Sequence, residues 1–137
     1  MNMRRVGLPM LVLALVAGCS RANAPKNLAD TVTKAVYSND ISHVAERFNA
    51  LIRPQLTRSS VGALSDKMHA QGDYQGLEQV QTGGTGGVYG YAAKFSHGSM
   101  LVCMKLDQDG KIAGYRVEPL GAGQPSPSTE NPCAMLK

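Results

Sequence analysis

The first half of the chain carries the periodicity of amphipathic helices. Apolar side chains recur at helical spacing in three stretches, near residues 28–38, 40–52 and 59–71. The residues expected to face inward are Leu28, Val32, Ala35 and Val36 in the first, Ile41, Val44, Ala45 and Phe48 in the second, and Val61, Leu64 and Met68 in the third. Asn39 or Asp40 can cap the second helix and Ser59 or Ser60 the third, which Gly72 can end in a left-handed conformation.

From Tyr74 onward the pattern changes to tyrosine, glycine and β-branched residues. It predicts four strands, at Tyr74–Gln81, Val88–Ser96, Met100–Asp107 and Lys111–Glu118. Asp109-Gly110 favours a tight hairpin turn in which both central residues have positive φ, and the glycine run 82–87 is expected to be a mobile hairpin loop. Consecutive hairpins make an antiparallel meander. The fold class is therefore α+β, with three N-terminal helices packed on a curved, cone-like, four-stranded antiparallel sheet.

The N-terminus has the pattern of a secretory signal. Two arginines at positions 4 and 5 precede ten apolar residues at 8–17, which is too short for a membrane span of roughly twenty residues. The sequence Val16-Ala17-Gly18-Cys19 then resembles a bacterial lipobox. We expect residues 1–18 to be a lipoprotein signal peptide, Cys19 to be lipidated and residues 19–26 to be a lipidated tether to the membrane.

Ser20 follows the cysteine, whereas retention in the inner membrane usually needs aspartate at that position. The expected location is therefore the outer membrane of a Gram-negative bacterium, facing the periplasm. Without the two signal arginines the net charge of +4 falls to +2, because 4 − 2 = 2, and no dense basic run is present. Nucleic acid is not an expected partner.

Two further cysteines, Cys103 and Cys133, remain after lipidation of the first. In an oxidising compartment they are expected to form a disulfide, which would pin the Pro/Gly/Ser-rich tail, residues 120–137, to the third strand. Two free thiols are the alternative. The cysteines are too far apart in sequence for a typical zinc site, and His43, His69 and His97 form no ligand pair, so neither a metal nor another cofactor is expected.

A family resemblance adds to this interpretation. It rests on the order of elements, Phe48-Asn49, Gly72-Asp73-Tyr74 and the hairpin from Leu106 to Pro119. Over residues 27–119 the chain is similar to small secreted bacterial members of the nuclear transport factor 2-like superfold, and it resembles a subgroup described only as a domain of unknown function. The resemblance implies a cone with a pocket between helices and sheet, in a superfold that includes both enzymes and non-catalytic binders.

Candidate binding residues are the large side chains of the predicted strands, Tyr89, Tyr91, Met104 and Tyr115; core packing is the alternative role for them. Acidic residues fall mainly at turns and helix caps, so no catalytic constellation is expected. The leading hypothesis is a non-catalytic, lipid-anchored periplasmic binding module for a small apolar ligand or an envelope protein. The alternatives are an immunity or inhibitor lipoprotein that neutralises an envelope-targeting enzyme, and a small-molecule isomerase or hydrolase using His43, His69 or an acid.

Overall fold

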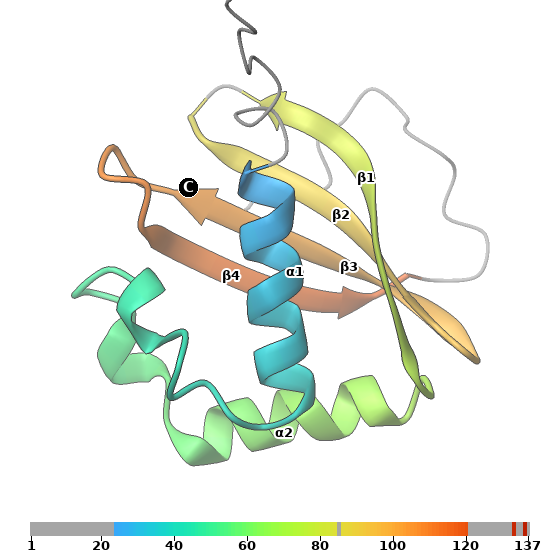
Figure 1. Cartoon of the computed structure of the whole chain (residues 1–137). Helices are drawn as coiled ribbons and strands as arrows, with labels where there is room; N and C mark the ends of the chain where they lie inside the picture. The colour runs from blue at the N-terminus through green and yellow to red at the C-terminus, as the bar shows by residue number, and fades with distance from the viewer. Residues whose placement is uncertain (1–23, 85, 121–132, 134–135, 137) are drawn as a thin grey trace, which may run out of the picture.

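The computed structural model describes residues 24–84, 86–120, 133 and 136. Two α-helices, α1 (Ala24–Tyr37) and α2 (Arg58–His69), are separated by two short 3-10 helices, η1 (Ala45–Arg47) and η2 (Arg53–Gln55). Four strands follow: β1 (Tyr74–Gly84), β2 (Val88–Phe95), β3 (Gly98–Leu106) and β4 (Ile112–Pro119). Helix α1 crosses one face of the twisted sheet, and α2 runs across the C-terminal end of α1 (Figure 1).

The sheet is an antiparallel meander in the order β1-β2-β3-β4. This confirms the predicted α+β class with a four-stranded antiparallel sheet. Strand β1 extends to Gly84, beyond its predicted end at Gln81, so part of the expected glycine loop belongs to the strand. At the last hairpin only Gly110, with φ +74°, has the positive φ expected of both turn residues. Asp109 needs none, because the Asp107 carboxylate accepts the backbone N–H groups of Asp109 and Lys111 and holds a longer loop.

The predicted inner faces of α1 and α2 form the core against the sheet. Val32, Ala35 and Val36 of α1 and Val61 and Met68 of α2 are all buried. The first helix begins at Ala24, inside the segment expected to be tether, and Pro25 fits there because first-turn N–H groups have no helical acceptor. Gly72 ends the α2 region with φ +92°, as predicted.

The second predicted helix is wrong. Residues 41–56 form turns and the two 3-10 helices instead, so the described residues contain two α-helices where three were expected. The Asn49 side chain accepts the N–H groups of Leu51 and Ile52, and the Asn49 N–H donates to the Ile112 carbonyl. These bonds replace the helical ones, while Phe48 is fully buried in the core and pairs with the edge of β4.

The N-cap of α2 is Thr57, not Ser59 or Ser60. The Thr57 hydroxyl accepts the Ser60 N–H at 3.1 Å, and the Ser60 hydroxyl accepts the Thr57 N–H at 3.0 Å. This reciprocal pair satisfies two N–H groups that the helix cannot pair internally. The N-terminus of α2 is therefore capped shortly after the 3-10 helix η2 ends.

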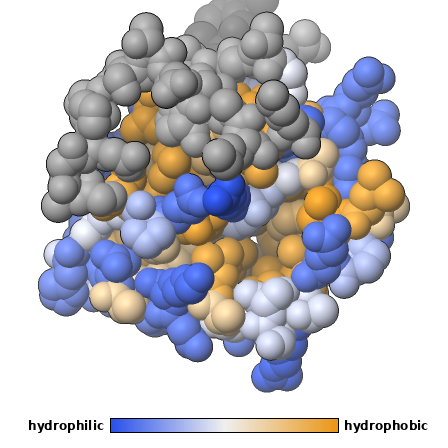
Figure 2. All heavy atoms as spheres, turned by 180° about the vertical axis from the view of Figure 1, so that it is seen from behind, coloured by the Kyte–Doolittle hydropathy of each residue, from blue (hydrophilic) through white to orange (hydrophobic). Residues whose placement is uncertain are grey.

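The outer face of the sheet, turned away from α1, carries a second apolar cluster. Val88, Leu101 and Cys103 are buried there with Cys133, and Leu120 and Leu136 pack against them. Cys103 and Cys133 form the expected disulfide, with a Cα–Cα distance of 5.5 Å. Figure 2 shows hydrophobic surface on this face among hydrophilic residues. The sheet thus has an apolar cluster on each side.

Residues 1–18, Cys19 and residues 20–23 lie outside the described residues, as does most of the predicted tail. Within the described ranges no helix has the length and hydrophobicity of a membrane span.

Candidate functional site

The four candidate binding residues all project from the inner face of the sheet. Tyr89, Met104 and Tyr115 lie side by side in one row across β2, β3 and β4, and Tyr91 lies in the neighbouring row opposite Val102. Tyr91 is 1% exposed and Met104 0%, while Tyr89 and Tyr115 are half-buried and pack against the same core. Tyr91 and Met104 are thus core residues under α1, and a role for the four in binding stays a prediction.

Helix α1 adds hydroxyl contacts to this row. The Thr33 hydroxyl and the Tyr115 hydroxyl form a hydrogen bond of 2.8 Å, and Thr33 is fully buried. Burial raises the pKa of Tyr115 well above its ordinary value, and the bond to Thr33 offsets this only in part. Burial also raises the pKa of Tyr91 to about 12. Both phenols are therefore neutral at physiological pH and suited to packing and hydrogen bonding.

A second polar cluster joins α1 to β1, and the sequence analysis missed it. The Tyr74 hydroxyl donates to one Asp30 oxygen at 2.7 Å, and Lys34 Nζ donates to the other at 2.7 Å. Burial alone would raise the pKa of Asp30, but the hydrogen bonds from Lys34 and Tyr74 outweigh it and lower that pKa. The i, i+4 spacing of Asp30 and Lys34 was visible in the sequence. The contribution of Tyr74 was not, because it depends on the fold.

The three histidines are all exposed. His69 Nδ1 lies 2.9 Å from the Ser65 carbonyl oxygen, and its ring stacks on Tyr37 with centroids 4.0 Å apart. These contacts give His69 a packing role at the end of α2. In the part of the chain that the structure describes, no group of three His, Cys, Asp or Glu residues is arranged to hold a metal ion.

An open groove of about 550 Å³ lies at the N-terminal end of α1, between that helix, η1 and the β3–β4 hairpin. Leu28 and Leu106 supply apolar surface, Asn27 and Thr31 supply polar groups, and Arg47 is the only charged residue among the described residues that line it. The volume is in the range of small-molecule sites. No motif in the sequence could have predicted this groove, because three separate segments build it.

The Arg47 side chain is exposed, and it has no hydrogen-bond or ion-pair partner among the described residues. Arg53, in the same loop region, is by contrast paired with Glu46 and with the Phe48 carbonyl. The groove therefore presents one available cation beside apolar surface. This combination suits a ligand that has an apolar part and an acidic group.

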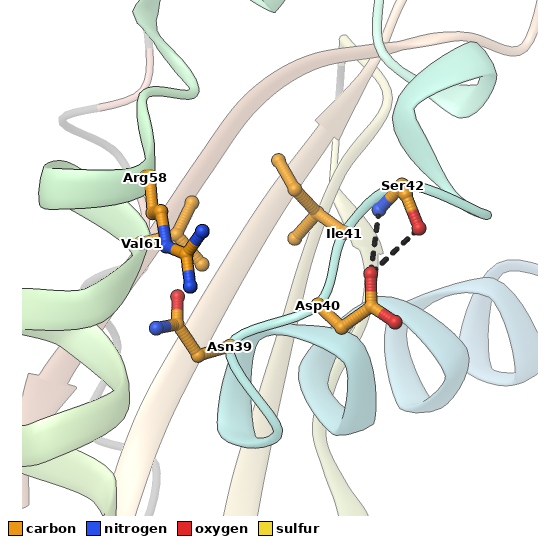
Figure 3. Close-up of a pocket in the computed structure, with 6 residues that line it drawn as sticks. All are labelled: Asn39, Asp40, Ile41, Ser42, Arg58 and Val61. Carbon is orange, nitrogen blue, oxygen red and sulfur yellow. Dashed lines mark hydrogen bonds between the residues drawn. The ribbon is translucent and has the colours of Figure 1, made fainter.

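A second concavity of about 460 Å³ lies at the opposite end of α1, where Asn39, Ile41 and Arg58 line it (Figure 3). Its Asp40 carboxylate turns toward Ser42 and accepts both the Ser42 N–H and the Ser42 hydroxyl. These bonds lower the pKa of Asp40. The carboxylate is thus engaged in holding the turn that follows α1, which indicates a structural role for it.

Comparison with known proteins finds no matching family model, curated protein or solved structure.

Proposed function

We propose that the protein is a non-catalytic, lipid-anchored binding module of the outer membrane of a Gram-negative bacterium, with its domain in the periplasm. The groove at the N-terminal end of α1 carries the proposal. It offers Leu28, Leu106 and Arg47, which has no partner among the described residues, to a small, mostly apolar ligand, and its lining residues Ala24 and Pro25 lie within the segment predicted to be the tether. The lipobox-like sequence that ends at Cys19 supports the anchor.

We also propose that the domain has nuclear transport factor 2-like architecture. Support comes from the order of elements, with helices before an antiparallel meander, and from the packing of α1 and α2 on one face of that sheet. The row of Tyr89, Met104 and Tyr115, of which Met104 is fully buried and the two tyrosines are half-buried, packs in the core between helix and sheet. We therefore place binding at the groove that adjoins this row, not inside it.

The anchor is tested by expressing the full chain in a Gram-negative host, separating the membranes and determining the mass of the mature N-terminus. We expect cleavage before Cys19, acyl chains on that residue and recovery in the outer membrane fraction. An N-terminus without acyl chains, or a protein found only in the soluble periplasm, would contradict the proposed anchor.

Binding is tested in the same cells by replacing Asn27, an exposed residue of the groove, with the photoreactive amino acid p-benzoylphenylalanine. The matched control carries the same amino acid at Ala63, which is exposed on α2 and does not line the groove. We expect an adduct of small-molecule mass at position 27 and none at position 63. An adduct of protein mass would show that the ligand is an envelope protein and not a small molecule. The absence of any adduct at position 27 would refute binding in the groove.

A further inference from the structure

The groove lies close to the position where the membrane anchor is expected. Ala24, the first residue of α1, lines it, and Cys19 precedes Ala24 by five residues. Five fully extended residues span at most about 18 Å. Any lipid attached to Cys19 therefore enters the bilayer within roughly that distance of the groove. The opposite end of the 14-residue helix α1 is about 21 Å farther along its axis.

The charge of the groove matches an anionic lipid head group. Among the described residues, Arg47 is the only charged side chain that lines the groove, and it has no partner there, so its guanidinium can form paired hydrogen bonds with a phosphate. The neighbouring Asp107 carboxylate already accepts three N–H groups, from the backbone of Asp109 and Lys111 and from Asn49 Nδ2. Asp109 precedes the lining residue Gly110 on the same hairpin and is exposed, but it does not itself line the groove.

The groove is open, and its contacts are few, so affinity for a free lipid should be weak. A tether changes this, because it gives the groove an effective lipid concentration in the millimolar range or above. Leu28 and Leu106 can then contact the glycerol and upper acyl region of a lipid whose phosphate lies at Arg47. Weak contacts suffice under these conditions.

We propose that the end of the domain formed by the N-terminus of α1, η1 and the β3–β4 hairpin docks on the membrane surface, with the head group of an anionic phospholipid in the groove. The proposal rests on the proposed function, since it requires the acyl anchor at Cys19. It identifies the ligand class as anionic phospholipid and gives the domain a fixed orientation, with α2 directed away from the bilayer.

The test uses the mature lipidated protein in vesicles of phosphatidylcholine with or without phosphatidylglycerol, and with a nitroxide on a fraction of the head groups. A fluorophore is placed on Thr31→Cys at the groove or on Lys67→Cys in the last turn of α2; both native residues are exposed. The native Cys103–Cys133 disulfide leaves the new thiol as the reactive one. We expect strong nitroxide quenching at position 31 and weak quenching at position 67, most clearly with phosphatidylglycerol present.

A matched pair of arginines tests the phosphate contact. Arg47→Gln should lower the ratio of docked to undocked protein on phosphatidylglycerol vesicles about fivefold, the effect of one basic side chain near an anionic surface. Arg58→Gln, an exposed arginine at the other concavity, should leave the ratio unchanged.

The possible failures differ in what they show. A protein that lacks acyl chains and does not float with vesicles would refute the proposed anchor. An acylated protein with equal quenching at positions 31 and 67 would refute the docked orientation alone. Quenching at position 31 that is the same with and without phosphatidylglycerol, or the same in wild type and Arg47→Gln, would refute the head-group site.

Discussion

Reduction of the disulfide between Cys103 and Cys133 should lower the stability of the domain, but its sheet should remain folded. The bond closes a loop with a sequence separation of 30. In the chain-entropy model such a loop restricts the unfolded chain enough to contribute about 3.6 kcal/mol at 25 °C. For a domain of this size that loss corresponds to a fall in Tm of roughly 15 °C. The inner core does not include either cysteine, so the fold should survive at low temperature.

The measurement is urea unfolding, followed by circular dichroism, of oxidised and reduced protein. The double variant Cys103→Ala/Cys133→Ala is the control, since it should be less stable than the oxidised protein and should not respond to reductant. The reduced protein should still unfold in one cooperative transition, and its m-value should be that of the unfolding of a whole domain. An unchanged urea midpoint after complete reduction would refute the loop-entropy reasoning, and loss of the sheet signal without urea would show that the outer cluster is essential to the fold.

Three other substitutions, one of them with a matched control, test separate parts of the fold by equilibrium unfolding. Thr57→Ala removes the N-cap of α2 and should cost about 1 kcal/mol; a cost near zero would contradict the capping role. Phe48→Ala should cost roughly 3–5 kcal/mol, because this side chain is fully buried, whereas Leu51→Ala, at a residue 80% exposed, should change stability by less than about 0.5 kcal/mol. The pKa of Asp30 is lowered in the folded state, so its stabilising effect is present above the unfolded-state pKa and is lost as pH falls through the folded-state value. Asp30→Asn should thus be less stable than wild type at pH 7, and the difference should shrink as pH falls below the unfolded-state pKa; a stability difference that stays constant as pH falls would contradict this assignment.

Local patterns in the sequence predict most of the fold. The spacing of apolar residues gives α1 and α2, and the turn residues give the four strands, because both signals arise within a few positions of the chain. The region from Ile41 to Phe48 shows the limit of this reasoning. Its apolar spacing suits a helix, but Phe48 is held by the non-local pairing with Ile112, and Asn49 bonds the local backbone in place of helical hydrogen bonds.

The outer apolar cluster could have been predicted. Residues 100–104 of β3 are five consecutive apolar residues, and such a run is typical of a strand that is buried on both faces. The alternating pattern expected of a sheet with one wetted face is absent there. The groove at the start of α1 is a different case, since its residues come from three segments whose proximity only the folded chain establishes.

The order of the strands also bears on how the chain reaches this fold. Every strand pairs with its neighbour in sequence, so each hairpin can form as soon as its second strand has left the ribosome or a translocation channel. Local pairing of this kind favours rapid folding. Two closures must wait for later residues: the Phe48–Ile112 pairing, which completes the edge of β4, and the link from Cys103 to Cys133. Oxidation is therefore expected to be the last step of folding and to lock a sheet that has already assembled.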